Sequence, residues 1–126
     1  MLVRFFTGEP PKQGAKVRTL VEKADAGEIT LLILPVIIAE TFYTLESFYE
    51  LKRARIAEKL IGFLHSRGIQ AAELDRILNA LERCVERKAH FADAYLAAAA
   101  IELQRPVSSF DRDFDKFLNV VRIEPI

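Results

Sequence analysis

The sequence predicts a single α/β domain in which a parallel sheet is covered by helices. Short apolar runs alternate along the chain with longer segments whose apolar residues recur every three or four positions. Strands that alternate with helices in this way form parallel sheets covered on both faces. The length of 126 residues suits one hydrophobic core, and no linker, repeat or low-complexity tract divides the chain. We therefore treat residues 1–126 as one domain.

The first elements follow from proline, glycine and apolar spacing. Two prolines open a helix over residues 10–26, and Gly27 is placed to end it. The run 29–34 is short and apolar, which predicts a buried strand. A helix is expected over residues 35–49, because its apolar residues repeat at helical spacing. The same criteria predict helices at 52–66, 73–87 and 91–103, strands at 68–70, 106–110 and 120–123, and a turn or short helix at 111–118.

Charge and cysteine content narrow the classes of function. Eighteen basic and 18 acidic residues leave no net charge, so any nucleic-acid surface must be a local patch. Cys84 is the only cysteine, which excludes an intrachain disulfide, and no Cys pair or His-rich run suggests zinc. The longest apolar run, 31–39, is shorter than the ~20 residues of a spanning helix and contains Pro35. We expect a cytoplasmic protein.

Four carboxylates stand where packing alone does not explain them. Glu40 interrupts a strongly apolar stretch, and Asp93 interrupts the alanine-rich helix. Asp111 and Asp113 directly follow a predicted strand. An ionised carboxylate among apolar neighbours is costly unless it is paired, and ligand sites of parallel sheets lie beyond the carboxyl ends of the strands. Hard divalent ions such as Mg²⁺ take oxygen ligands, so the pattern predicts a shared cation.

Each acid also has an ordinary structural explanation. Glu40 suits a carboxylate at the edge of the core that is paired with an arginine. Asp93 gains from the helix dipole near a helix start, and Asp111 suits a turn or cap. His90, three residues before Asp93, fits either a surface position beside the cap or a role toward substrate. These alternatives stay open on the sequence pattern alone.

Five short segments occur in a fixed order, at residues 2–9, 26–29, 39–40, 91–94 and 109–114. In this order and spacing they resemble the PIN-domain family, especially the VapC-type toxins of prokaryotic toxin–antitoxin pairs. The resemblance covers nearly the whole chain. It implies a PIN-like three-layer fold with a parallel β-sheet flanked by helices, which agrees with the pattern of elements.

The resemblance also implies an activity, cofactors and partners. Family members are mostly Mg²⁺- or Mn²⁺-dependent ribonucleases, in which a metal-activated water hydrolyses RNA phosphodiesters. By match to the family motifs, Glu40, Asp93 and Asp111 are the expected catalytic residues and metal ligands, and Asp113 is an additional acid at the metal. Ser109 resembles the small hydroxyl residue that braces such a site. The expected partners are an RNA substrate, an antitoxin protein and a second copy of the chain in a homodimer.

One part of the family pattern is not found. Family members open with a strand that ends in Asp-x-Asn, directly before the segment that matches Leu2–Arg4, and the printed sequence has neither the strand nor the motif. That strand normally lies in the middle of the sheet, so its neighbours would keep unpaired edges. We expect that Met1 is an internal start, at a valine codon, and that in-frame upstream codons supply the motif. The alternative is a shortened, inactive relative.

Two other functions compete with the nuclease. One is a catalytically inactive PIN-like binding module that pairs with an antitoxin-like protein. The other is a phosphatase, which would need an Asp-x-Asp-x-[Thr/Val] element that the sequence lacks.

The helix at 35–49 carries four aromatic residues and is followed by the basic stretch 52–55. Basic residues beside aromatic ones can bind single-stranded RNA. The helical spacing of the aromatic residues favours core and interface positions instead. Core and interface positions are therefore what we expect for them.

Overall fold

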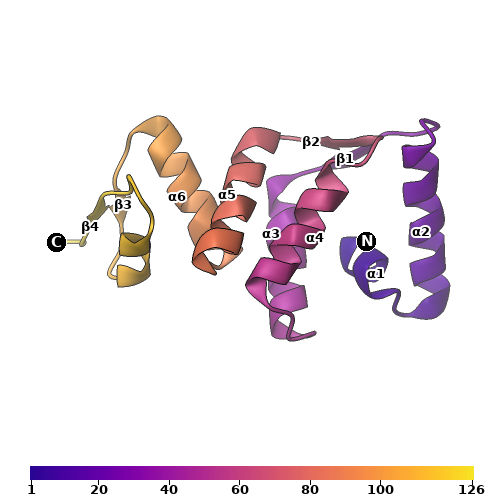
Figure 1. The fold of residues 1–126 in the computed structure, drawn as a ribbon, viewed down its shortest axis with the longest axis horizontal. Coiled ribbons are helices and arrows are strands. Elements are labelled where there is room, and N and C mark those ends of the chain that lie inside the picture. Colours follow the sequence, from indigo (N-terminus) through magenta and orange to yellow (C-terminus); the bar gives the residue numbers. More distant parts are fainter.

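The computed structural model describes residues 1–126 and shows helices joined by short strands (Figure 1). The first half contains α1 (Leu2–Thr7), α2 (Pro11–Asp25), β1 (Leu31–Ile33), α3 (Pro35–Ser47) and α4 (Arg53–Leu64). The second half contains β2 (Ile69–Ala71), α5 (Leu74–Arg87), α6 (Phe91–Leu103), β3 (Val107–Ser108), the 3₁₀ helix η1 (Arg112–Lys116) and β4 (Arg122–Ile123). None of the helices has the length and hydrophobicity that crossing a membrane requires.

The predicted α/β class is confirmed. Helices α2 to α6 begin and end within two residues of the predicted bounds, and η1 lies in the segment expected to be a turn or short helix. The strands occur at the predicted places but are only two or three residues long. The helix α1 was not predicted from the sequence, because its six residues are too few to establish a helical period.

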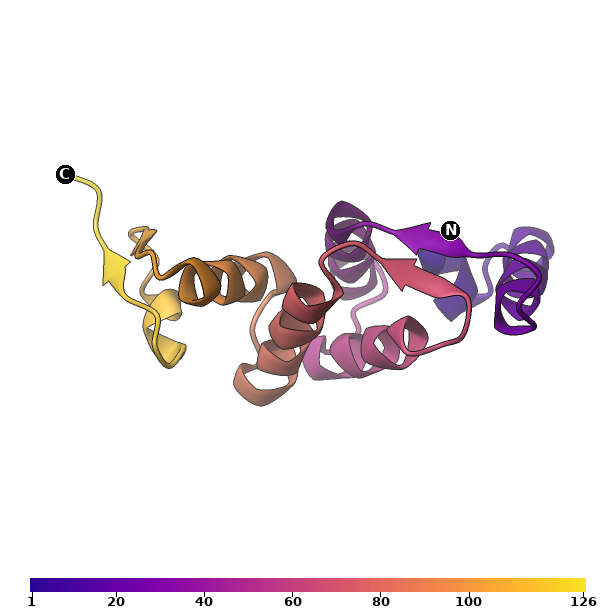
Figure 2. The ribbon, with the colours of Figure 1, turned by 90° about the horizontal axis from the view of Figure 1, so that it is seen from above.

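The strands pair in parallel, as predicted, but they form two separate sheets. Strand β1 pairs with β2 in the register Leu31↔Ile69, and β3 pairs with β4 in the register Val107↔Arg122. Figures 1 and 2 show β3 and β4 at one end of an elongated molecule, beyond α6, and β1 and β2 nearer α1 and α2. The sequence pattern predicted a single sheet. The structure has two, because no strand lies between β1 and β3 and pairs with both.

One hydrophobic core is shared by α3, α4, α5 and α6. The rings of Phe42 and Phe91 are fully or almost fully buried, and their centroids lie 5.9 Å apart. Helices α5 and α6 pack closely, since Ala94 and Ala97 on α6 are completely buried and leave room for the backbone of α5 to approach. Close packing of this alanine-rich helix was the sequence-based interpretation, and it is confirmed.

The free edge of β1 leaves apolar surface uncovered. Leu31 donates its N–H to the carbonyl of Gly68 (2.8 Å) and Ile33 accepts from Ala72 (3.0 Å), so in a parallel ladder the peptide groups of Leu32 face the other edge. The Leu32 side chain is 62% exposed and that of Val36, at the start of α3, is 64% exposed. An open strand edge with exposed apolar side chains is a surface that other chains can pair with.

Candidate functional site

Glu40 lies in the second turn of α3, shortly after β1 ends. Pro35 is the first residue of this helix. An N–H at that position would have no partner within the helix, so its absence in proline costs nothing. The Glu40 side chain is exposed on the same face as Val36 and Tyr43. It takes part in none of the salt bridges of the structure, so the arginine partner of the ordinary structural explanation is not present.

Asp93 lies in the first turn of α6 and is half-buried. A network just outside this turn fixes the start of α6. His90 is the N-cap residue, and its Nδ1 lies 2.9 Å from Oε1 of Glu46 on α3. Glu46 also forms a salt bridge with Arg53 on α4, and Arg53 donates to the carbonyl of Lys88 (3.0 Å). The network ties α3, α4 and the segment before α6 together, and it therefore holds Asp93 in place.

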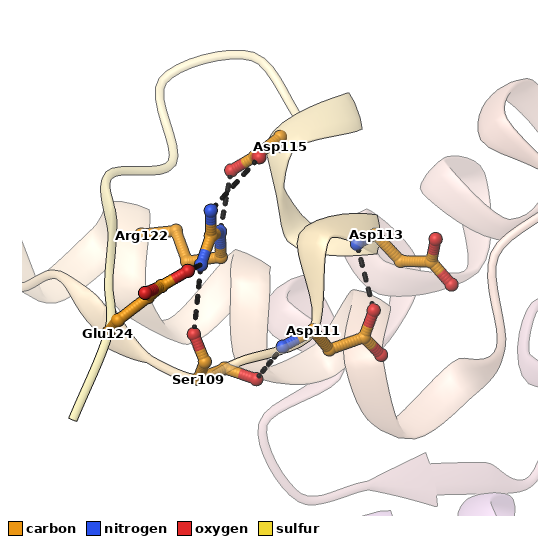
Figure 3. A network of polar contacts seen from close by, with 6 residues as sticks. All are labelled: Ser109, Asp111, Asp113, Asp115, Arg122 and Glu124. Carbon is orange, nitrogen blue, oxygen red and sulfur yellow. Dashed lines mark hydrogen bonds and ion pairs between the residues drawn. The ribbon is translucent and has the colours of Figure 1, made fainter.

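Asp111 is the N-cap residue of η1, in the turn that follows β3, and Asp113 lies in the first turn of η1, as Figure 3 shows. The Oδ1 atom of Asp111 accepts a hydrogen bond from the N–H of Asp113 (2.8 Å), which caps η1. The hydroxyl of Ser109 accepts from the N–H of Asp111 (2.9 Å), so Ser109 holds the residue before the 3₁₀ helix. Figure 3 shows both carboxylates on the side of the turn away from Arg122, and both are exposed.

The other side of this turn is held by Arg122 on β4. Its guanidinium donates to both carboxylate oxygens of Asp115 (2.9 and 3.3 Å), to Glu124 (3.2 Å) and to the carbonyl of Ser109 (3.1 Å). The hydrogen bond from Arg122 holds the pKa of Asp115 below its usual value, and Asp115 in turn raises the pKa of Arg122. The network joins η1 to β3 and β4 and so orients the segment that carries Asp111.

The structure does not bring the four predicted ligands together. No group of three or more His, Cys, Asp or Glu side chains is arranged so that it could hold a metal ion. The reason is the split sheet, because Glu40 follows β1 in one sheet and Asp111 follows β3 in the other. As placed, the carboxylates do not fit a metal site made of protein ligands alone.

The sequence model of the PIN domain matches residues 1–118, which include all four acids. The chain belongs to the PIN-domain family. No curated protein matches the chain, and no solved structure matches it. PIN domains are usually nucleases, so membership supports a nuclease-type, hydrolytic function with nucleic acid as the substrate. PIN nucleases generally use divalent metal ions.

Sequence reasoning missed the residues that hold the acids in place. Glu46 and Arg53 lie far from His90 along the chain, and nothing in their spacing indicates that they meet. Arg122 follows Asp115 by seven residues and was assigned only to the last strand. The single available signal was a His directly before a helix start, which is a position suited to capping interactions.

Proposed function

We propose that this PIN-domain protein is a Mg²⁺- or Mn²⁺-dependent endoribonuclease of the VapC type, the toxin of a toxin–antitoxin pair. The observation that carries the proposal is the family match over residues 1–118, which contains Glu40, Asp93, Asp111 and Asp113 in the expected order. Glu40, Asp93 and Asp111 are proposed as the catalytic acids and metal ligands, with Asp113 beside them. An antitoxin protein, a homodimer and a cytoplasmic location belong to the same proposal.

The chain's own residues supply the arrangement around the acids. The His90–Glu46–Arg53 network holds the start of α6 and with it Asp93. Ser109 and Arg122 hold the turn that presents Asp111. A divalent metal ion, when bound, would supply positive charge at the phosphodiester and an acidified water. In the structure the four carboxylates do not form a group that could hold this ion.

The proposal is tested by RNA cleavage with matched variants. The wild-type chain is incubated with a varied RNA panel with and without Mn²⁺ or Mg²⁺, beside Glu40→Gln, Asp93→Asn and Asp111→Asn. Each variant removes a charge and nearly keeps the shape, so the fold is preserved while cleavage is lost. Glu58→Gln on α4 is the control, because Glu58 is likewise an exposed helical glutamate. If Glu40→Gln still cleaves RNA in a metal-dependent way, Glu40 is not a residue of the catalytic site.

A second function is favoured by one specific observation. The acids are not gathered, so the chain as folded suits a catalytically inactive PIN-like module that binds an antitoxin-like protein. The exposed apolar edge of β1 offers such a partner a surface. The binding-module function would be favoured over the nuclease if the wild-type chain binds RNA or a partner but cleaves no RNA with any metal ion.

A further inference from the structure

Two adjoining hollows lie where α3 ends and α4 begins. One is lined by Glu46, Leu51, Lys52, Arg53, Ala54 and Lys88. The other is lined by Phe6, Thr7, Glu9, Leu45, Tyr49, Leu51, Arg55 and Lys59. Leu51 lines both, so the hollows form one continuous surface, which we call the α3–α4 groove. The end of α3 and the start of α4, which carry these residues, lie at the bottom of Figure 1.

The α3–α4 groove is basic although the chain as a whole is neutral. Five basic and two acidic side chains line it. Lys52, Arg55, Lys59 and Lys88 take part in none of the salt bridges of the structure. One of the two acids, Glu46, is already paired with Arg53 and His90. The groove therefore presents four unpaired cations against one unpaired acid, Glu9.

An exposed aromatic ring lies next to Tyr49, which lines the groove. Phe48 is 78% exposed, and its ring contacts that of Tyr49 edge to face, with centroids 5.1 Å apart. Phe42, on α3, is fully buried, whereas Phe48 is the C-cap residue that follows this helix. Core packing therefore explains Phe42, as the helical spacing predicted, but it does not explain Phe48. Leaving a Phe side chain in water forgoes about 1.5–3 kcal/mol of burial, and the exposed Phe48 ring is accessible to a ligand.

We propose that the α3–α4 groove binds single-stranded RNA, with Lys52, Arg55, Lys59 and Lys88 on the phosphates and Phe48 stacked on a base. Unpaired cations next to an exposed aromatic ring are the combination that sequence-tolerant single-strand binding uses. The inference rests on the proposed function for its choice of ligand. Glu46, which lines the groove, contacts His90 at the N-cap of α6, so the groove adjoins the start of the helix that carries the proposed catalytic acid Asp93.

The test measures binding separately from cleavage. Fluorescence anisotropy follows a fluorescein-labelled oligouridylate in EDTA, over a series of salt concentrations. The double variants Arg55→Gln/Lys59→Gln and Lys52→Gln/Lys88→Gln each remove two proposed phosphate contacts. Each is expected to raise Kd about tenfold at low salt and to lower the salt slope by about 1.4, since each single-strand contact contributes about 0.7. Phe48→Ala is expected to raise Kd about tenfold with the salt slope unchanged, because stacking is not ionic.

The control removes the same charge elsewhere. Lys12→Gln/Lys16→Gln changes two exposed lysines on α2, outside the groove, and should leave Kd within about twofold of wild type. Equal weakening by the control and groove variants, or no RNA binding by wild type, would overturn the inference. The inference would also be overturned if the groove variants kept RNA binding but lost binding to polyglutamate. That result would identify an acidic polypeptide as the occupant of the groove. If the groove variants lose RNA binding and the wild type does not cleave RNA, the groove is supported as an RNA-binding surface. Only the proposed nuclease activity is then refuted.

Discussion

Replacing Gly68 by alanine tests how the chain enters β2 and holds β1. Gly68 has φ +81°, in the left-handed region, and a Cβ at this position would lie 2.1 Å from the carbonyl oxygen of Ala24 at the end of α2. The contact is with backbone, so it cannot be relieved by a side-chain rotation. The carbonyl of Gly68 also accepts the N–H of Leu31 (2.8 Å), the first rung between β1 and β2.

The expected cost of Gly68→Ala combines conformation and overlap. The left-handed conformation costs a non-glycine residue about 1–2 kcal/mol. Forcing an extra methyl group against packed neighbours costs about 1–3 kcal/mol. The lower entropy of alanine in the unfolded chain offsets about 0.4–1 kcal/mol of this. We therefore expect a loss of about 1–4.5 kcal/mol, to be compared with the ~5–15 kcal/mol that stabilises a typical domain.

Gly62→Ala is the matched control for the same chemical change. Gly62 lies in the last turn of α4, and a Cβ there would meet nothing within 4 Å. Alanine at an exposed helical position should stabilise the chain by about 0.5–1 kcal/mol. Urea denaturation followed by far-UV circular dichroism measures both variants. A Gly68→Ala variant as stable as wild type, or a Gly62→Ala variant that is less stable, would refute the account of this connection.

Three further predictions concern the core and the ionised groups. Phe42→Ala should lower the free energy of unfolding by about 3–5 kcal/mol in urea denaturation, because it empties the centre of the core; Tyr43→Ala, on the exposed face of α3, should cost far less. Burial raises the pKa of the Cys84 thiol to about 12, so the folded chain should react with a thiol reagent near neutral pH only after denaturant is added, and rapid reaction without denaturant would contradict this. The folded pKa of Asp115 lies below its unfolded value because of Arg122, so its contribution to stability is present above the unfolded pKa of about 3.9 and is lost as the pH falls through the folded pKa. Asp115→Asn should accordingly lower the urea midpoint at neutral pH but leave it unchanged in strong acid, and an equal difference at both would refute the ion pair's role.

The parts of the fold that the sequence predicts are the longer helices, which are marked by an apolar period or by a run of helix-favouring residues. α6 was predicted with its observed bounds, since alanines and leucines continue to the residue before Gln104, which adopts a left-handed conformation. β3 was predicted over five residues and contains two, because the length of a strand depends on a neighbour to pair with. Pairing is a long-range property, and the split of the sheet was therefore not visible in local pattern.

The candidate site, too, could be predicted from the sequence only in part. The element that carries each acid was predicted, as was the position of Asp111 just after a strand. The hydrogen bonds around the acids were not, because His90 and Glu46 are 44 residues apart and meet only when α3 packs beside α6. The convergence of Glu40 with Asp111 was inferred from a continuous sheet, and the two sheets of the structure remove that premise.

The dispersed acids lead to a prediction about the order of binding. Mg²⁺ sites are often completed by one or two carboxylates together with substrate phosphates, and protein cages for this ion are uncommon. With no preformed group of three ligands, Mn²⁺ or Mg²⁺ alone should leave the thermal midpoint of the chain nearly unchanged. A ligand present at a hundred times its Kd would add about 2.7 kcal/mol and would be evident in the same melt.

The same melt should change when a non-cleavable oligonucleotide is added with the metal, because its phosphates supply the missing oxygen ligands. Glu40→Gln should remove the part of the shift that depends on metal and keep the part that depends on the oligonucleotide. The groove variant Arg55→Gln/Lys59→Gln should lose both parts of the shift at low oligonucleotide concentration, because without the bound oligonucleotide the metal ion lacks its phosphate ligands. A large midpoint shift with metal alone would show that the acids converge in solution without RNA, and the split sheet would then not be the arrangement that binds metal.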